Sequence, residues 1–245
     1  MVKIGVEVNS VKLRFSIKAF LINLNRDLEK IVTRIDNKHY DQIYYDHSPD
    51  MSIECLSDLQ KAILYLEDRR FLSHSGFDFR SPFRQLKRIV SGKRFGAVST
   101  IDQQLVRIIS RRYERTLRRK VREVVLAFLL NAHRSKSQIF YAYLHDSYYG
   151  YRLEGCEITS NFLFSKKSID LNVSEACFIA ALLARPLPKA VFDVIENEKK
   201  FRDITPERII KVAELLRIDW SLHIKRRYNY ALEMFPSIPS SLRIR

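Results

Sequence analysis

Apolar residues recur at three- and four-residue steps through most of this 245-residue chain. Leu56, Leu59, Ile63 and Leu66 are one example, and their spacing predicts a helix that carries Glu67 near its C-terminal end. The chain has only six Gly and seven Pro, too few for the repeated tight turns of an all-β fold. The sequence therefore predicts a mostly α-helical protein.

The spacing of apolar residues and the positions of helix-capping residues predict further helices and one strand. Weak alternation favours a short strand at 2–8, and an amphipathic helix is expected around 14–28. Ser99 is the expected N-cap of a helix running to about Arg111, and Ser174 that of a buried helix running to about Ala184. Other helices are expected over 136–144, 205–217, 219–234 and 115–133, the last with an apolar stripe made by Val121, Val124, Val125, Phe128 and Leu129.

No internal repeat or long linker divides the chain, although its length allows one domain or two. We expect an N-terminal segment, 1–55, whose amphipathic helix packs on the domain, then a core at 56–190 and a helical extension of the same domain at 191–245. The best candidate for a membrane span, 15–24, is broken by Lys18 and Asn23, and no signal-peptide cleavage site is visible.

The charge balance predicts a polyanionic partner. Lys and Arg number 43 against 28 Asp and Glu, a net charge of +15. Nucleic acid, anionic lipid and phosphorylated substrates all fit such a charge, as does a generally basic soluble protein. Cys55, Cys156 and Cys177 have neither the number nor the spacing of a disulfide framework or a zinc site.

The segment that starts at Glu67 has the pattern Glu-Asp-Arg-x-Phe-x-x-His-x-Gly-x-Asp. Glu67 and Asp68 beside Arg69 and Arg70 would usually be a solvated helix end. A carboxylate that follows an apolar helix also suits a general base, if its surroundings bring its pKa towards the working pH. His74 alone is more often a structural histidine, and we give it no catalytic role.

A second polar set lies on the helix expected after Ser99. Positions 100, 103, 104 and 107 share one face of a helix. That face carries Thr100, Gln103, Gln104 and Arg107, groups that suit a saccharide and a phosphate. An ordinary solvated helix face is the alternative.

A third polar set is Arg115, Arg119, Lys120 and Glu123. The steps from Arg115 to Arg119 and from Arg119 to Glu123 are i,i+4, and Lys120 to Glu123 is i,i+3. An isolated set of this kind is usually a surface salt bridge worth roughly 0.3–0.5 kcal/mol.

In this order, the three sets resemble the motifs of glycosyltransferase family 51, the peptidoglycan glycosyltransferases. The resemblance extends over about 56–190, through a fourth motif between Lys136 and Lys166 and an apolar fifth between Leu171 and Pro186. Where the family has Gly-Gly-Ser-Thr-Ile-Thr-Gln-Gln, this chain has Ala-Val-Ser-Thr-Ile-Asp-Gln-Gln at 97–104. Asp102 is unfavourable beside a diphosphate site unless an arginine or a metal pairs with it. Further departures are Tyr141 for Glu, His145 for Asn and Ser165 for Gly.

The resemblance implies a lysozyme-like helical domain of two lobes with a central cleft. It implies that Glu67 is the general base and Glu123 the second essential carboxylate. The implied substrate contacts are Asp68, Arg70, Ser99, Thr100, Gln103, Gln104, Arg107, Arg115, Arg119 and Lys120. The donor would be lipid II, whose diphosphate is already activated, so no cofactor is required, although a divalent cation such as Mg²⁺ or Mn²⁺ is compatible with the chemistry.

The partners implied are lipid II, the growing glycan strand and an anionic membrane surface. The expected place is the periphery of the bacterial inner membrane, on a side that the sequence does not decide. One alternative is a degenerate member that binds a lipid-linked precursor or a cell-wall partner without turnover, prompted by the altered motifs. A less favoured alternative is a basic helical nucleic-acid-binding protein, which would show steeply salt-dependent affinity but has no recognisable motif.

Overall fold

The computed structural model describes residues 3–37, 53–78, 99–198 and 203–237. The chain is mostly α-helical, as expected. The helices are α1 (Lys3–Asn37), α2 (Asp58–Glu67), α4 (Ile101–Ser110), α5 (Leu117–His133), α6 (Lys136–Asp146), α7 (Cys156–Phe164), α8 (Val173–Leu182), α9 (Lys189–Glu198), α10 (Pro206–Leu216) and α11 (Ile218–Met234). Two short strands, β1 (Tyr148–Gly150) and β2 (Leu153–Glu154), pair antiparallel, and short 3₁₀ turns are η1 (Ile53–Cys55), η2 (Phe71–Ser73), η3 (Ser168–Asp170) and η4 (Phe235–Ser237).

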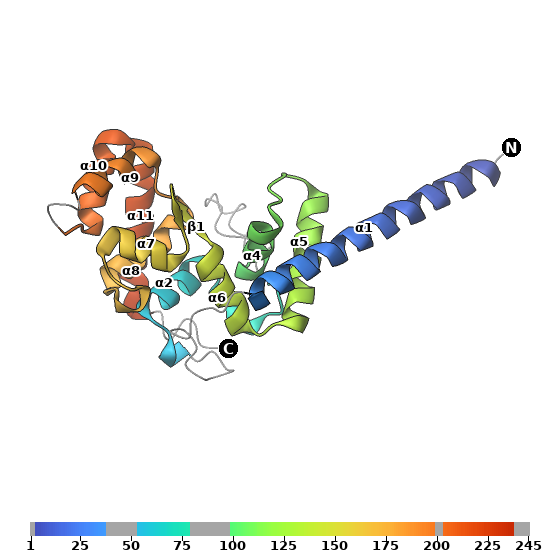
Figure 1. Cartoon of the computed structure of the whole chain (residues 1–245), viewed down its shortest axis with the longest axis horizontal. Helices are drawn as coiled ribbons and strands as arrows, with labels where there is room; N and C mark the ends of the chain where they lie inside the picture. Colours follow the sequence, from blue (N-terminus) through green and yellow to red (C-terminus); the bar gives the residue numbers. More distant parts are fainter. Residues whose placement is uncertain (1–2, 38–52, 79–98, 199–202, 238–245) are drawn as a thin grey trace, which may run out of the picture.

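The helices form two lobes (Figure 1). In one, α2 packs against α8, α8 against α11, and α10 against α9 and α11. In the other, α4 packs against α5 and α6, and the C-terminal half of α1 lies against α4 and α5. The expected two-lobed, lysozyme-like architecture is therefore confirmed.

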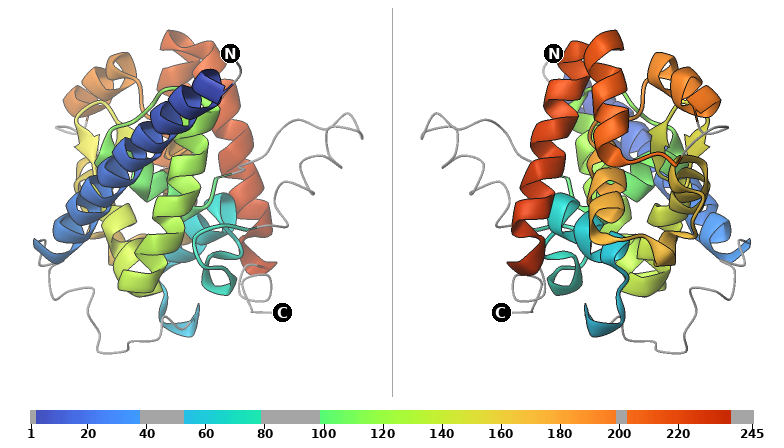
Figure 2. Two further views of the ribbon diagram at one scale, coloured as in Figure 1. Left: turned by 90° about the vertical axis from the view of Figure 1, so that its right-hand side faces the viewer. Right: turned by 90° about the vertical axis from the view of Figure 1, so that its left-hand side faces the viewer.

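Helix α1 replaces the strand expected at 2–8, so that prediction was wrong. One continuous helix is formed because the weak alternation continues directly into the helical pattern around 14–28. Leu24, Ile31 and Ile35 are buried against the domain, where α1 crosses α5 (Figure 2). The N-terminal half of α1 projects away from the body (Figure 1). Within the described ranges, none of the helices combines the length and the apolar composition that a membrane span requires.

Helix α2 begins and ends as the sequence suggests. The Ser57 side chain accepts a hydrogen bond from the backbone of Gln60, and the Gln60 side chain accepts one from the backbone of Ser57. This capping box satisfies two N–H groups that the first turn leaves free. Leu59, Ile63 and Leu64 are buried, so packing against α8 fixes the position of Glu67 at the C-terminal end.

Two helix caps differ from the prediction by one or two residues. Thr100, not Ser99, caps α4, because its hydroxyl accepts a hydrogen bond from the Gln103 N–H. Asn172, not Ser174, caps α8, with Glu175 completing a capping box. Ser99 stands next to Thr100, and Ser174 stands two residues after Asn172. All of these residue types are good N-caps, so the sequence pattern alone does not choose between them.

The buried face of α5 is not the predicted apolar stripe. Val121 and Phe128 are exposed, whereas Arg122 and Glu123 are buried beside Leu126, Ala127 and Leu130. Charged groups enter this interface because other side chains neutralise them: Arg122 Nε donates to Asp27 Oδ2 of α1 at 2.9 Å. The helix thus presents apolar side chains to solvent and a paired carboxylate to the interior.

Candidate active site

Glu67 is held at both carboxylate oxygens. Its Oε2 accepts a hydrogen bond from Gln104 Nε2 in α4 at 3.0 Å. Its Oε1 accepts one from Arg227 Nη2 in α11, and the side chain is 8% exposed. Gln104 Oε1 in turn accepts a hydrogen bond from the Tyr143 hydroxyl of α6 at 2.9 Å. Side chains of α11 in one lobe and α4 in the other therefore meet at the carboxylate that ends α2.

The Tyr143 hydroxyl keeps its proton and donates it in a hydrogen bond to Gln104. Burial raises the pKa of its phenol well above the usual 10.0, and the negative charge of Glu67 raises it further. Arg227 opposes the shift in that pKa. The phenol therefore stays protonated at neutral pH and orients the Gln104 amide so that the NH₂ faces Glu67.

Glu123 lies on the buried face of α5 and is surrounded by cations. Arg107 of α4 donates to it twice, from Nε to Oε1 at 2.9 Å and from Nη2 to Oε2 at 3.3 Å. Arg119 pairs with Oε1, and Lys120 Nζ lies 3.7 Å from Oε2. Three cations around one carboxylate leave an excess of positive charge at this point.

Ser99 and Gln103 complete the cation cluster. Ser99 Oγ accepts hydrogen bonds from Lys120 Nζ at 2.9 Å and Arg107 Nη2 at 3.2 Å. Lys120 Nζ also donates to Gln103 Oε1 at 2.6 Å. Burial lowers the pKa of Lys120, Glu123 raises it, and the charges of Arg107 and Arg119 lower it. The structure thus joins Ser99, Gln103 and Arg107 of the second predicted set to Arg119, Lys120 and Glu123 of the third, whereas Thr100 and Arg115 are not part of this cluster.

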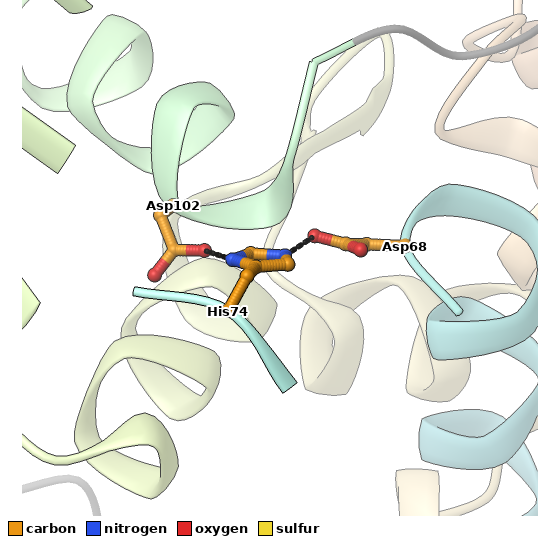
Figure 3. Close-up of side chains that lie close together, drawn as sticks. All are labelled: Asp68, His74 and Asp102. Carbon is orange, nitrogen blue, oxygen red and sulfur yellow. Dashed lines mark hydrogen bonds and ion pairs between the residues drawn. The ribbon is translucent and has the colours of Figure 1, made fainter. Parts of the chain in front are cut away.

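Asp68 belongs to a buried polar group with His74 and Asp102 (Figure 3). Its Oδ2 accepts hydrogen bonds from the Ile101 N–H of α4 at 3.1 Å and pairs with His74 Nε2 at 3.0 Å. His74 Nδ1 lies 3.9 Å from Oδ2 of Asp102, on the other side of the ring. This group joins the end of α2 to the start of α4.

Asp102 is paired, as its position requires, and its partner is a lysine where the sequence suggested an arginine or a metal. Lys136 Nζ of α6 lies 2.9 Å from Oδ1, and Asn131 Nδ2 donates to the same oxygen at 2.7 Å. The Asp102 side chain is 0% exposed. Its charge is therefore neutralised inside the lobe and is not presented to a substrate.

Asp68, His74 and Asp102 bring one potential metal-ligand atom each within 4.8 Å of one another. The arrangement does not fit a single ion well. The two ring nitrogens of His74 face different carboxylates (Figure 3), so no one nitrogen joins both to a metal. Lys136 already supplies the counter-charge of Asp102. We assign this group a structural role in joining α2, α4 and α6.

Besides Asp68, three predicted contact residues lie outside the clusters around Glu67 and Glu123. Thr100 is buried, and its hydroxyl donates to the carbonyl of Gly76 at 2.8 Å. Arg70 Nη1 donates to Asp78 Oδ1 at 2.7 Å. Arg115 is exposed ahead of α5 and has no ion-pair partner among the described residues. Their roles as substrate contacts stay predictions. The altered positions 97 and 98 lie outside the described residues.

Two glycine positions of the resemblance have a structural reason. Gly76 has a φ of +88°, and a Cβ there would lie 2.5 Å from the backbone of Ala127 in α5. Only glycine allows this approach. Ser165, which replaces a glycine of the motif, has a φ of 54° at the end of α7, a left-handed conformation that favours glycine.

Sequence reasoning missed Arg227 and gave Tyr143 no role at the site. Tyr143 lies in the fourth motif, but nothing in the sequence indicates that it contacts Gln104. Arg227 is 160 residues from Glu67 in a segment without a recognisable motif, and no local pattern signals the contact.

The comparisons with known proteins agree with this geometry. The family model described as Transglycosylase matches residues 31–211. Penicillin-binding protein 1F of Bacillus subtilis (strain 168) is 32% identical over 186 residues, which cover 72% of this chain and 26% of that protein. Penicillin-binding protein 1A of Clostridium tetani is 35% identical over 166 residues, covering 65% and 20%. The biosynthetic peptidoglycan transglycosylase of Alcanivorax borkumensis is 36% identical over 129 residues, covering 52% and 53%.

The chain thus spans between 20% and 53% of the length of these relatives. The family match begins within α1 and ends within α10, so it is wider than the 56–190 segment of the sequence resemblance. With the family model covering most of the chain and the motif residues gathered at one place, this chain belongs to the transglycosylase family.

Proposed function

We propose that the chain is a peptidoglycan glycosyltransferase that polymerises lipid II-type undecaprenyl-diphosphate disaccharides into β-1,4 glycan strands with inversion. The observation that carries the proposal is the pair of buried carboxylates. Glu67 is held by neutral and cationic donors, whereas Glu123 organises a cluster of cations. The two carboxylates therefore have different surroundings and suit different roles.

Glu67 is the general base of this proposal. Its carboxylate takes the proton of the acceptor sugar's 4-hydroxyl while that oxygen attacks the anomeric carbon of the donor. The bond from the anomeric carbon to the diphosphate oxygen breaks, and the lipid diphosphate leaves with the electron pair. Attack from the opposite side inverts the anomeric carbon, as in an inverting glycosidase with a sugar hydroxyl in place of water. Glu67 then returns the proton to solvent.

The cation cluster stabilises the leaving diphosphate. Arg107, Arg119 and Lys120 keep positive charge in excess after pairing with Glu123. Fixed charges of this kind act where negative charge develops and need no reorganisation during the reaction. Glu123 thereby supports the leaving group by positioning its counter-ions.

We expect no cofactor to be required, since the diphosphate activates the donor. A divalent cation, Mg²⁺ or Mn²⁺, would bind chiefly through the diphosphate oxygens. Turnover measured with each ion and with a chelator tests this expectation.

Exposed apolar groups support an anionic membrane surface as a partner. Leu117, Val121 and Phe128 lie on the outer side of α5, and Leu21 and Ile22 are exposed on α1. Between α1 and α5 lies a cavity of about 350 Å³ that is lined by Arg112, Arg118, Arg119 and Arg122. Apolar side chains beside arginines suit peripheral binding at the bacterial inner membrane. We expect no nucleic acid as a partner.

The deciding experiment is polymerisation of labelled lipid II by the purified chain in detergent or vesicles. We expect glycan strands from the wild type and none from Glu67→Gln, which keeps the side chain's size but removes the base. No product from the wild type, together with tight binding of the donor, would favour the non-catalytic alternative. Unchanged product from Glu67→Gln would show that Glu67 is not the base.

A further inference from the structure

Arg227 of helix α11 contacts Glu67, the proposed base, although it lies outside every recognised motif. Arg227 Nη2 pairs with Glu67 Oε1 and lies 3.5 Å from the Leu66 carbonyl. The family model ends at residue 211, before α11 begins. We propose that Arg227 is a positioning residue that holds the Glu67 carboxylate in its reactive orientation. The inference rests on the function proposed above.

The backbone around Arg227 is fixed from two sides. On one side, Arg69 Nη2 donates to the Tyr230 hydroxyl at 2.6 Å, and the Arg69 guanidinium stacks 3.7 Å from the Tyr65 ring centre. On the other, the buried Tyr228 hydroxyl lies 2.6 Å from Glu207 Oε1 of α10 and 2.6 Å from Ser174 Oγ of α8. These contacts hold the stretch of α11 from which the Arg227 side chain reaches Glu67.

The Arg227 side chain directs its guanidinium at Glu67 and at the neighbouring Leu66 carbonyl. Arg227 is 24% exposed, and its Nε is buried without a hydrogen-bond partner in the described part of the chain. Here one terminal nitrogen makes the contact with Glu67, and the guanidinium supplies the counter-charge of a carboxylate that is 8% exposed.

Two donors on opposite oxygens fix the plane of the Glu67 carboxylate. Gln104 Nε2 lies 3.0 Å from Oε2, and Arg227 occupies one position at Oε1. Each carboxylate oxygen has a second lone pair, so room remains for the acceptor hydroxyl. Without Arg227 the carboxylate keeps only the Gln104 amide and is free to rotate. A misplacement of about 1 Å is enough to cost roughly 100-fold in rate.

The kinetic test compares Arg227→Ala, Arg227→Lys and Arg226→Ala. Arg226 is the matched control, because it is the same residue type on the same helix and is exposed. We expect Arg227→Ala to lower kcat roughly 100-fold with KM changed much less, since the acceptor hydroxyl and not the diphosphate loses its partner. Arg227→Lys and millimolar guanidinium added to Arg227→Ala should each restore part of kcat. Arg226→Ala should behave as the wild type.

A purely structural role predicts different results. It would lower the kcat of Arg227→Ala with no recovery from added guanidinium or from Arg227→Lys, and that outcome overturns the inference. Wild-type kcat in Arg227→Ala also overturns it. Absence of product from the wild type would instead contradict the proposed function.

The contact itself is tested without turnover by thermal unfolding. Arg227→Ala should lower the midpoint in the wild type and much less in Glu67→Gln, because the pair is already broken there. Equal shifts in both backgrounds would show that the two side chains are not coupled, and the inference would fail on that result alone.

Discussion

Lys136 Nζ lies 2.9 Å from Asp102 Oδ1, and this ion pair ties the first turn of α6 to the first turn of α4. The family pattern has a threonine at position 102, so the carboxylate is a departure of this chain. Burial lowers the pKa of Lys136, and the charge of Asp102 opposes that shift. Each charge is therefore kept in the interior by the other.

Replacing Lys136 by Met should destabilise the fold. The change leaves the fully buried Asp102 without its counter-charge, and breaking such a pair costs about 3–5 kcal/mol. The free energy of unfolding in urea measures the loss. Lys225→Met is the control, because both side chains of its pair with Glu214 are exposed and such a pair is worth at most about 1 kcal/mol. Similar losses in both variants would contradict the importance given to burial.

Tyr143→Phe should slow turnover while leaving the fold intact. It removes the hydroxyl that donates to Gln104 at 2.9 Å and so frees the amide to rotate away from Glu67. One net hydrogen bond is worth about 0.5–1.5 kcal/mol, which corresponds to a decrease in kcat of about twofold to tenfold. Tyr148→Phe on the exposed end of β1 is the control. A wild-type kcat in Tyr143→Phe would remove Tyr143 from the positioning of Glu67.

Helix α5 shows what a hydrophobic pattern can and cannot predict. Its existence and extent followed from the sequence, but its orientation did not. Pattern places Val121 and Phe128 inside and charges outside, whereas Arg122 and Glu123 are buried here. Burial of a charge depends on partners from other helices, and those partners are invisible in a local window.

The part of the site that consists of motif residues could be predicted from the sequence. Arg107, Lys120 and Glu123 meet as their ordered motifs implied. Arg227 was not predictable, because its contact with Glu67 joins positions 160 residues apart and depends on how α11 packs against α2 and α8.

Lys120 predicts an alkaline limit to donor binding. Burial lowers its pKa below the usual 10.5, so its positive charge is lost as pH rises towards that value, earlier than for an exposed lysine. If Lys120 contacts the diphosphate as proposed, KM for the donor should therefore rise through this range, because that cation is lost. Lys120→Arg should flatten the profile, since a guanidinium stays charged. An equally steep rise in Lys120→Arg would assign the titration to another group.

The exposed apolar side of α5 should govern attachment to lipid. Phe128 is 60% and Val121 50% exposed, on the same side of the helix. Burying a side chain of this kind is worth about 1.5–3 kcal/mol, so Phe128→Ser should lower partitioning into vesicles by about tenfold or more. Val121→Ser should add to the effect.

Co-sedimentation with vesicles of phosphatidylglycerol and phosphatidylcholine measures this partitioning. Ile158→Ser on α7 is the control, because Ile158 is 56% exposed but lies on the other lobe. Binding should also weaken with salt and with less anionic lipid, since arginines line the neighbouring cavity. Equal losses from Phe128→Ser and Ile158→Ser would show that α5 is not the lipid-facing surface, because a general loss of apolar area would then explain both.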